Sequence, residues 1–211
     1  MILQINEEHP QPRRIDRICE TLSSGGLVAY PTDTVYGIGC DIYNKQAVEQ
    51  LQRLVKEIKG EAETSPLSFI CQDLSNIAEY AYVGDHAYRT LRRMLPGPYT
   101  FVLEATKLVP TVMRNKRKTV GIRVPDHPIP HAIVDRLGNP VANTSATDRD
   151  GELIPDPWTI DDLYGHAVDL IVDGGYVFPE PSTVIDFSQD YPQLLRQGKG
   201  EIGDLEYVEL I

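Results

Sequence analysis

The stretch GGLVAYPTDTVYGIG, residues 25–39, decides the fold class of this chain. Within it, residues 27–30 are apolar and predict a short buried strand, which the two glycines before it separate from a preceding helix. Residues 30–39 are rich in Pro, Gly and Thr and predict a loop. Loops of this kind at the carboxyl ends of strands expose backbone N–H groups and hydroxyls, and α/β proteins usually bind their ligands there.

Helical and strand patterns alternate along the rest of the chain. Apolar residues at helical spacing predict helices over residues 13–24, 45–59, 74–81, 86–95 and 131–137. Strands are predicted at residues 67–71, 100–105, 119–124, 141–143, 168–172, 182–187 and 193–196. Because helices and strands interleave over the whole length without an internal repeat or a low-complexity linker, we predict one α/β domain. The pattern leaves open which strands run parallel.

The composition is typical of a cytoplasmic globular protein. No window approaches the roughly 18 consecutive apolar residues of a membrane span, and the first residues lack the layout of a signal peptide. The formal net charge of −11 disfavours broad nonspecific binding to nucleic acids. The three cysteines, Cys19, Cys40 and Cys71, are widely spaced, and we interpret them as buried free thiols.

Positive charge is nevertheless concentrated in two places. Arg89, Arg92 and Arg93 form one cluster, and residues 114–123 supply five more basic side chains. Such segments suggest local anion binding in an acidic protein. For residues 114–118 alone, a solvated basic loop is an equally good interpretation.

Four loops repeat the same design, with Pro, Gly, Ser or Thr next to a strand. They are PTDT after residue 30, PGPYT after residue 95, NTSAT after residue 142 and PEPST before residue 184. Together with Arg123 and Arg196, which lie at predicted strand ends, these loops favour a pocket for a phosphate or a carboxylate.

Several familiar catalytic motifs are absent. Without a Walker A sequence, a nucleotide would have to bind without the standard P-loop geometry. His127 and His131 are four residues apart but lack the H-E-x-x-H context, so we interpret them as surface or capping histidines and predict no metal site. Since no motif singles out a nucleophile, the sequence favours chemistry by positioning and electrostatics, as in nucleotidyl transfer.

A series of segments resembles the YrdC/YciO family in identity and in order. The segments are GGLVAYPTDTVYGIG, SPLSFIC, LPGPYTFVL, VGIRVPDHP, TSA, PSTVID and LLRQGKG. The resemblance covers residues 12–203, and the LLRQGKGEI ending is most similar to the YciO branch. It implies a single domain with a twisted, mixed parallel and antiparallel sheet and helices around a large, positively charged concave cavity, without a second domain.

The best-known members of this family are threonylcarbamoyl-AMP synthases. The resemblance therefore implies that L-threonine, bicarbonate and ATP with Mg²⁺ bind in the cavity. Threonine is carboxylated on its amine, and the carbamate attacks the α-phosphate to give threonylcarbamoyl-adenylate and pyrophosphate, for modification of tRNA at adenosine 37. Fixed cations and hydrogen-bond donors are what a protein can contribute to both steps.

The resemblance also implies roles for individual residues. Thr34, Thr144 and Ser182 correspond to positions that contact the substrate threonine, and Arg123 to the arginine that pairs with its carboxylate. Lys59, with Lys56 as the alternative, corresponds to the lysine of a K-x-R motif that serves the phosphates, and we count it with Arg123 as catalytic. The remaining ATP-binding positions are Thr100, Ser145 and Arg196.

Two positions depart from the family pattern. Glu61 stands where the arginine of the K-x-R motif is expected, and Thr147 replaces an asparagine. An anion in place of a phosphate-facing cation reverses the sign of a strong short-range interaction. Three functions therefore stay open: a synthase, a noncatalytic protein that binds double-stranded RNA or nucleotides, and an adenylate-forming enzyme with another acceptor. The oligomeric state is not predicted.

Overall fold

The computed structural model describes residues 1–59, 67–113, 117–189, 191–203 and 209–210. The helices in this part of the chain are α1 (Pro12–Ser23), α2 (Lys45–Lys59), α3 (Leu74–Tyr80), α4 (Asp85–Met94), α5 (Pro128–Leu137) and α6 (Pro157–Tyr164), with one 3-10 turn, η1 (Thr111–Met113). The strands are β1 (Ile2–Gln4), β2 (Val28–Tyr30), β3 (Gly37–Asp41), β4 (Ser68–Ile70), β5 (Ala81–Tyr82), β6 (Tyr99–Ala105), β7 (Thr119–Arg123), β8 (Val141–Ser145), β9 (Leu170–Asp173), β10 (Thr183–Asp186), β11 (Gln193–Arg196) and β12 (Glu209–Leu210).

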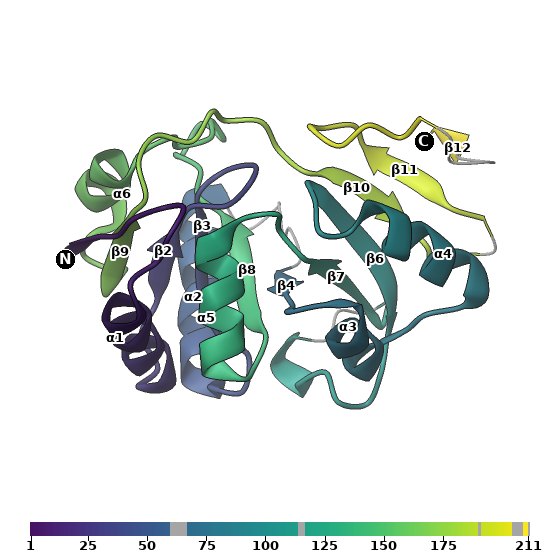
Figure 1. Ribbon diagram of the computed structural model, residues 1–211, viewed down its shortest axis with the longest axis horizontal. Helices are drawn as coiled ribbons and strands as arrows, with labels where there is room; N and C mark the ends of the chain where they lie inside the picture. Colours follow the sequence, from purple (N-terminus) through teal and green to yellow (C-terminus); the bar gives the residue numbers. More distant parts are fainter. Residues whose placement is uncertain (60–66, 114–116, 190, 204–208, 211) are drawn as a thin grey trace.

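These strands form one continuous mixed sheet (Figure 1). Their order is β1-β9-β2-β3-β8-β4-β7-β6-β10-β11-β12, and β5 pairs with β6 beside this path. The pairs β1–β9, β2–β9, β4–β7, β6–β10 and β11–β12 are parallel, and the other pairs are antiparallel. The α/β fold with a mixed sheet that the sequence predicted is therefore confirmed.

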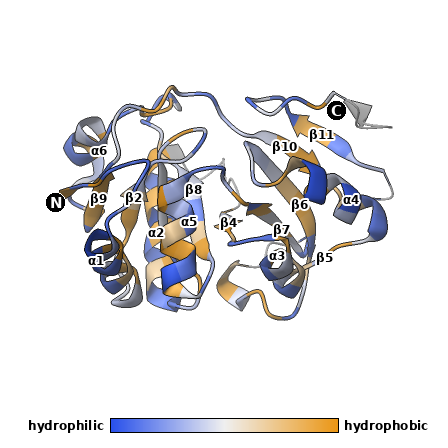
Figure 2. Ribbon diagram, in the orientation of Figure 1, coloured by the Kyte–Doolittle hydropathy of each residue, from blue (hydrophilic) through white to orange (hydrophobic). Residues whose placement is uncertain are grey.

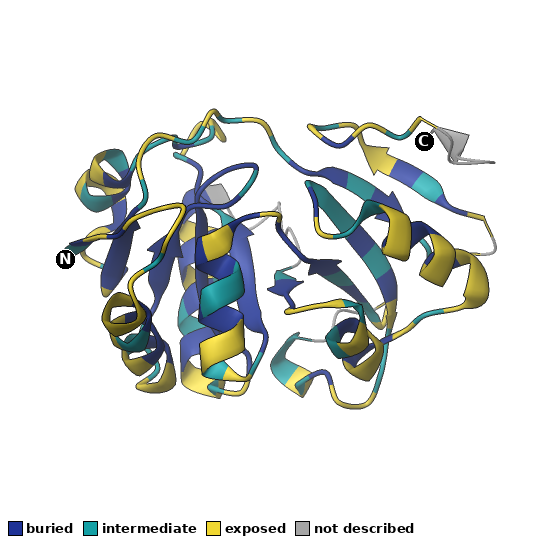
Figure 3. Cartoon of the chain, in the orientation of Figure 1, coloured by how far each residue is buried: buried dark blue, intermediate teal, exposed yellow. Residues whose placement is uncertain are grey.

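Helices cover both faces of the part of the sheet that contains β2. Leu27, just before this strand, and Ala29 within it belong to one buried cluster, together with apolar residues of α2. Val28 and Tyr30 belong to a second cluster, with apolar residues of α1 and α5. A strand that is buried on both faces is apolar at every position, which is the pattern of residues 27–30. Figure 2 shows β2 and β9 as mainly hydrophobic beside a hydrophilic α1, and Figure 3 shows that the helices expose their outer faces.

Local signals explain where the helices begin and end. Asn44 accepts a hydrogen bond from the backbone N–H of Ala47 at 3.1 Å and so caps the start of α2. His127 caps α5 through the N–H of Ile129, and Gly138 ends that helix in the left-handed conformation with φ of 73°. The boundaries of the predicted helices thus depend on short polar and glycine residues that lie just outside them.

The prediction of a loop over residues 30–39 is wrong for its last three residues, because residues 37–41 form β3. A side chain at Gly37 would collide with the amide of Asn143, and one at Gly39 would collide with β8. The glycines therefore permit close approach of two strands instead of a turn. The pattern also missed β1, β5, β12 and α6, which are short; β1 extends the sheet beyond the predicted start at residue 12.

Replacement of Gly39 by alanine tests this explanation. The new Cβ would lie 2.6 Å from Cγ1 of Val141 and 2.7 Å from the carbonyl oxygen of Ala142. We expect Gly39→Ala to lower the free energy of unfolding by about 1–3 kcal/mol, measured by urea denaturation. Gly121→Ala is the matched control in another strand, because its nearest neighbour would be 3.4 Å away. We expect a change within about 0.5 kcal/mol there; equal losses in both variants would contradict the explanation.

Candidate functional site

Four polar side chains that the sequence singled out gather at one edge of the sheet. The strands β6 and β10 are parallel neighbours, so both begin at this edge. Since β7 runs antiparallel to β6, and β11 antiparallel to β10, these two strands end there. Thr100 and Ser182 lie at the two strand starts, and Arg123 and Arg196 at the two strand ends. The edge thus combines two hydroxyls with two guanidinium groups.

Strand register turns these side chains toward the same face. Val184 of β10 pairs with Thr100 on one side and with Arg196 on the other, and paired residues in a sheet share a face. The adjacent β11 residue in register is Leu194, so a regular ladder would bring Leu195 opposite Val184. The register shift at this point inserts one extra residue and places Arg196 there instead. The bulge therefore sets the direction of the Arg196 side chain.

The loop between β2 and β3 is organised by Thr32. Its hydroxyl donates to the carbonyl of Val35 at 2.6 Å and accepts from the backbone N–H groups of Thr34 and Val35, each at 3.2 Å. The hydroxyls of Thr32 and Thr34 are 3.0 Å apart. Because the single proton of Thr32 already goes to Val35, Thr34 is the donor in this contact. The oxygen of Thr34 is left to accept from a cation.

That cation is Arg123. Its Nη2 lies 2.8 Å from the hydroxyl oxygen of Thr34 and 2.9 Å from Oδ1 of Asp33. The side chains of Arg123 and Asp33 are only 4% and 8% exposed, so the ion pair is desolvated. Burial lowers the pKa of Arg123, and the charge of Asp33 opposes this effect. The Nε atom is buried and has no hydrogen-bond partner among the described residues, which is uncommon for a buried donor.

Arg196 is the second cation of the site. Its Nε donates to the carbonyl of Ser182 at 3.0 Å, and its Nη2 lies 3.1 Å from the hydroxyl oxygen of the same residue. That hydroxyl is in turn 2.8 Å from the hydroxyl of Thr100. Partial burial of the guanidinium lowers the pKa of Arg196, and the positive charge of Arg123 lowers it further. The two guanidinium groups are therefore close enough to repel each other.

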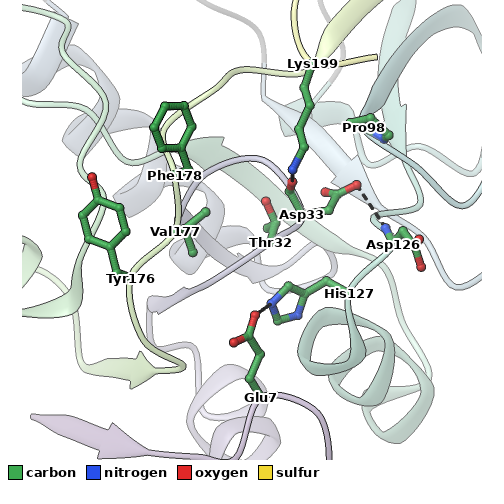
Figure 4. A pocket seen from close by; sticks show the side chains of 10 residues that line it. All are labelled: Glu7, Thr32, Asp33, Pro98, Asp126, His127, Tyr176, Val177, Phe178 and Lys199. Carbon is green, nitrogen blue, oxygen red and sulfur yellow. Dashed lines mark hydrogen bonds and ion pairs between the residues drawn. The ribbon is translucent and has the colours of Figure 1, made fainter. Parts of the chain in front are cut away.

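A cavity of about 400 Å³ opens beside this cluster (Figure 4). Its wall includes Asp33 and Asp126, and Oδ2 of Asp33 accepts from the backbone N–H of Asp126 at 3.1 Å. The ammonium group of Lys199 donates a hydrogen bond to the carbonyl oxygen of Asp33. Two exposed aromatic residues, Tyr176 and Phe178, line the other side. The lining mixes charges, and a positively charged cavity stays a prediction.

His127 lies in the cavity wall beside Glu7. Its Nδ1 accepts from the N–H of Ile129 at 3.2 Å, so Nε2 carries the proton and donates to Oε1 of Glu7 at 3.2 Å. Burial lowers the pKa of His127, and Glu7 opposes this effect. The interpretation of His127 as a capping residue is confirmed, although it is buried and not at the surface.

The other predicted site residues lie on β8 and α2 or outside the described part of the chain. Thr144 and Ser145 end β8 and pair with Ile38 and with Gly37, the first residue of the strand that follows the loop of Thr34. Lys56 is exposed on α2 and makes no hydrogen bond or ion pair with the described residues. Lys59 ends α2. Its side chain, Glu61 and residues 114–116 lie outside the described part of the chain, so the altered K-x-R motif stays a sequence prediction.

Thr147, which replaces the expected asparagine, is buried at 5% exposure. Its hydroxyl has no hydrogen-bond partner among the described residues. A buried hydroxyl without a partner costs free energy unless a ligand or water supplies one. Thr147 therefore keeps a polar group available, but with one donor where asparagine has two.

The sequence patterns did not indicate Asp33 and Lys199 as members of the site. Asp33 stands inside the quoted PTDT motif, between two threonines. Its negative charge was the available signal, because the predicted cation Arg123 needs a partner when buried. Lys199 lies in the LLRQGKG segment, three residues after Arg196. Nothing in the sequence indicated that Glu7, Tyr176 or Phe178 would line the same cavity, because they come from segments far apart in the chain.

The prediction for the three cysteines is confirmed. The three cysteines are buried free thiols, and burial raises the pKa of Cys40 to about 12. Within residues that the structure describes, no group of three or more His, Cys, Asp or Glu side chains is arranged to hold a metal ion. The same residues contain no helix long and apolar enough to cross a membrane.

Comparison with known proteins finds relatives over most of the chain. A sequence model of the Sua5_yciO_yrdC family, described as "Telomere recombination", matches residues 20–198. "Uncharacterized protein YciO" of Escherichia coli K12 is 39% identical over 200 residues, which are 94% of this chain and 95% of that protein. The "Threonylcarbamoyl-AMP synthase" of Vibrio vulnificus YJ016 is 30% identical over 188 residues, 87% of this chain and 98% of the relative.

Solved structures agree at the level of the fold. The crystal structure of E. coli YciO superposes with a TM-score of 0.90 at 36% identity and covers 98% of this chain and 99% of its own. The crystal structure of P. abyssi Sua5 complexed with L-threonine has a TM-score of 0.83 at 29% identity, and covers 94% of this chain and 57% of that one. The family match and these likenesses span nearly the whole chain, which therefore belongs to the Sua5/YciO/YrdC family.

Proposed function

We propose that this chain is a threonylcarbamoyl-AMP synthase-like nucleotidyltransferase that joins L-threonine, bicarbonate and ATP. The observation that carries the proposal is a pair of guanidinium groups at the same end of the sheet, Arg123 beside the hydroxyl of Thr34 and Arg196 beside the hydroxyl of Ser182. Two cations that have a single carboxylate partner among the described residues form a site that an anionic ligand would stabilise. Family relatives named threonylcarbamoyl-AMP synthases support the choice of reaction.

In this proposal, Arg123 pairs with the carboxylate of L-threonine. A guanidinium matches a carboxylate through two parallel hydrogen bonds. The hydroxyl of Thr34 accepts from Nη2 of Arg123 and helps to orient the guanidinium. Ser182, Thr144 and the cavity wall surround the remainder of the amino acid. The related Sua5 of P. abyssi has been crystallised in complex with L-threonine, which supports this assignment.

Arg196, Thr100 and Ser145 would face ATP, with Lys59 or Lys56 at its phosphates. Ser182 accepts from Arg196, so its own proton can go to Thr100, which leaves the proton of Thr100 free for a ligand. Mg²⁺ would enter with ATP, because this ion commonly binds through substrate phosphates, water and only one or two carboxylates. Its contribution is to neutralise charge on the phosphates during transfer.

The reaction then needs no covalent intermediate with the protein. The amine of threonine attacks the carbon of bicarbonate, and water leaves as the carbamate forms. A carbamate oxygen next attacks the α-phosphorus of ATP, and the bond to the β-phosphate oxygen breaks to release pyrophosphate. Negative charge develops at the carbamate and at the α-phosphate, and Arg123 and Arg196 stabilise it there. An acceptor other than threonine would use the same steps.

A second function is favoured by one observation on the surface. Arg89, Arg92 and Arg93 are exposed on α4. They make no ion pair with the residues described. Double-stranded RNA would bind there through its phosphates, with an affinity that falls steeply with salt. A variant with all three arginines changed to glutamine should bind double-stranded RNA more weakly, and its affinity should fall less steeply with salt than that of the wild type. This result would support the role independently of pyrophosphate release.

Pyrophosphate release tests the enzymatic proposal. We expect release from ATP and Mg²⁺ only when L-threonine and bicarbonate are both present. Arg123→Lys keeps the charge but loses the paired donors, so kcat/KM for threonine should fall by at least about 30-fold, equivalent to about 2 kcal/mol. Arg136→Ala is the control, since Arg136 is exposed and pairs with Asp16 at 2.6 Å on α1. Pyrophosphate release that does not depend on threonine, or an equal fall of kcat/KM in both variants, would contradict the proposal.

Restoration of the K-x-R arginine gives a separate prediction. Glu61→Arg exchanges an anion for a cation where the family places one, and we expect pyrophosphate release to rise by about tenfold, equivalent to about 1.4 kcal/mol. Glu63→Arg makes the same change in net charge two residues further along and should leave the rate nearly unchanged. If both variants accelerate the reaction equally, net charge and not the motif position is responsible.

A further inference from the structure

We infer that Asp33 is an internal competitor that occupies the carboxylate-binding position of Arg123 and must leave before a ligand carboxylate can bind there. The inference rests on the proposed function for the identity of the ligand, L-threonine, but its geometry concerns any carboxylate. The site assigns to Asp33 the control of ligand affinity, a role separate from catalysis.

The first step is the hydrogen bonding of Arg123. Nη2 donates to both Asp33 and Thr34, at 2.9 and 2.8 Å. A carboxylate can bind a guanidinium with two parallel bonds either through Nε and Nη2 or through Nη1 and Nη2. Both arrangements use an N–H bond of Nη2, and its two N–H bonds already go to Asp33 and Thr34. An incoming carboxylate therefore cannot form the paired contact while Asp33 stays in place.

The second step is that Asp33 is held as a bound ligand would be. One of its oxygens pairs with Arg123, and the other accepts from the backbone N–H of Asp126 at 3.1 Å. The Asp33 side chain is 8% exposed, so it satisfies a buried guanidinium in the absence of a ligand. A substrate carboxylate would make the same kind of contact, and the two anions exclude each other.

The third step is an alternative position for Asp33. Lys199 lies over the same residue, where its ammonium donates to the backbone carbonyl of Asp33 (Figure 4). It forms no ion pair with a carboxylate among the residues that the structure describes. A turn of the Asp33 side chain toward Lys199 exchanges one cationic partner for another. Displacement then leaves neither charge without a partner.

The consequence is an affinity lower than the site could provide. The apparent dissociation constant of a ligand rises in proportion as the binding-competent state becomes less populated. Asp33→Asn removes the competing charge and should tighten carboxylate binding. Lys199→Gln removes the alternative partner and should weaken binding, but only when Asp33 is present.

The experiment is a titration of the ¹⁵N-labelled chain by NMR with two probes, L-threonine and acetate. For both probes, we expect Asp33→Asn to bind about tenfold more tightly than the wild type. Asp126→Asn is the matched control, because it removes an equal charge from the same cavity wall and leaves the Arg123 pair intact; its affinity should change less than about threefold. Lys199→Gln should weaken binding in the wild type and change nothing in Asp33→Asn.

The acetate arm separates this inference from the proposed function. Tighter acetate binding by Asp33→Asn, without any threonine-dependent pyrophosphate release, would support the competitor and contradict the synthase. Equal or weaker binding by Asp33→Asn, no detectable acetate binding by it, or an equal gain in Asp126→Asn would overturn the inference. Thermal unfolding checks that each variant is folded, and Asp33→Ser replaces Asp33→Asn in the titration if the latter is not.

Discussion

Burial of the Arg123 guanidinium is the constraint on which the site depends. Arginine stays charged in proteins, so a buried guanidinium needs partners from the chain itself. Asp33 and Thr34 supply them from the loop after β2, and Thr32 fixes that loop in turn. Removal of one partner from a buried pair of this kind typically costs about 3–5 kcal/mol. The same contact thus joins two segments that are distant in the sequence.

The sheet provides the geometry around this cation. The bulge at Leu195 directs Arg196 to the face that already carries Thr100 and Ser182. A net charge of −11 repels anionic substrates at long range. Binding of the anionic substrates that we propose would therefore depend on short-range contacts, of which those with the desolvated guanidinium of Arg123 gain most from a low local dielectric.

Local patterns in the sequence predicted most elements, and the motifs predicted candidate site residues whose roles stay predictions. Arg196, Ser182 and Thr100 form one hydrogen-bonded chain, and Arg123 and Thr34 form a second contact. The register shift that makes this possible is a property of strand pairing, which no local pattern contains. Glycine patterns misled the assignment of β3, since close approach to β8 and a turn both favour glycine.

The partners of the site residues were harder to predict. Asp33 is adjacent to Thr34, but its pairing with Arg123 joins residues 90 positions apart. The lining residues Glu7, Tyr176 and Phe178 meet only because the sheet brings the chain segments together. The role of the segment with Lys59 and Glu61 remains a prediction from the motif, because the structure does not describe those side chains.

A crystal structure of this chain with L-threonine would test the account most directly. The account predicts the carboxylate of threonine within about 3 Å of Nη2 of Arg123, and the side chain of Asp33 turned away from Arg123 toward Lys199. Threonine bound elsewhere, with the ion pair between Arg123 and Asp33 unchanged, would contradict it.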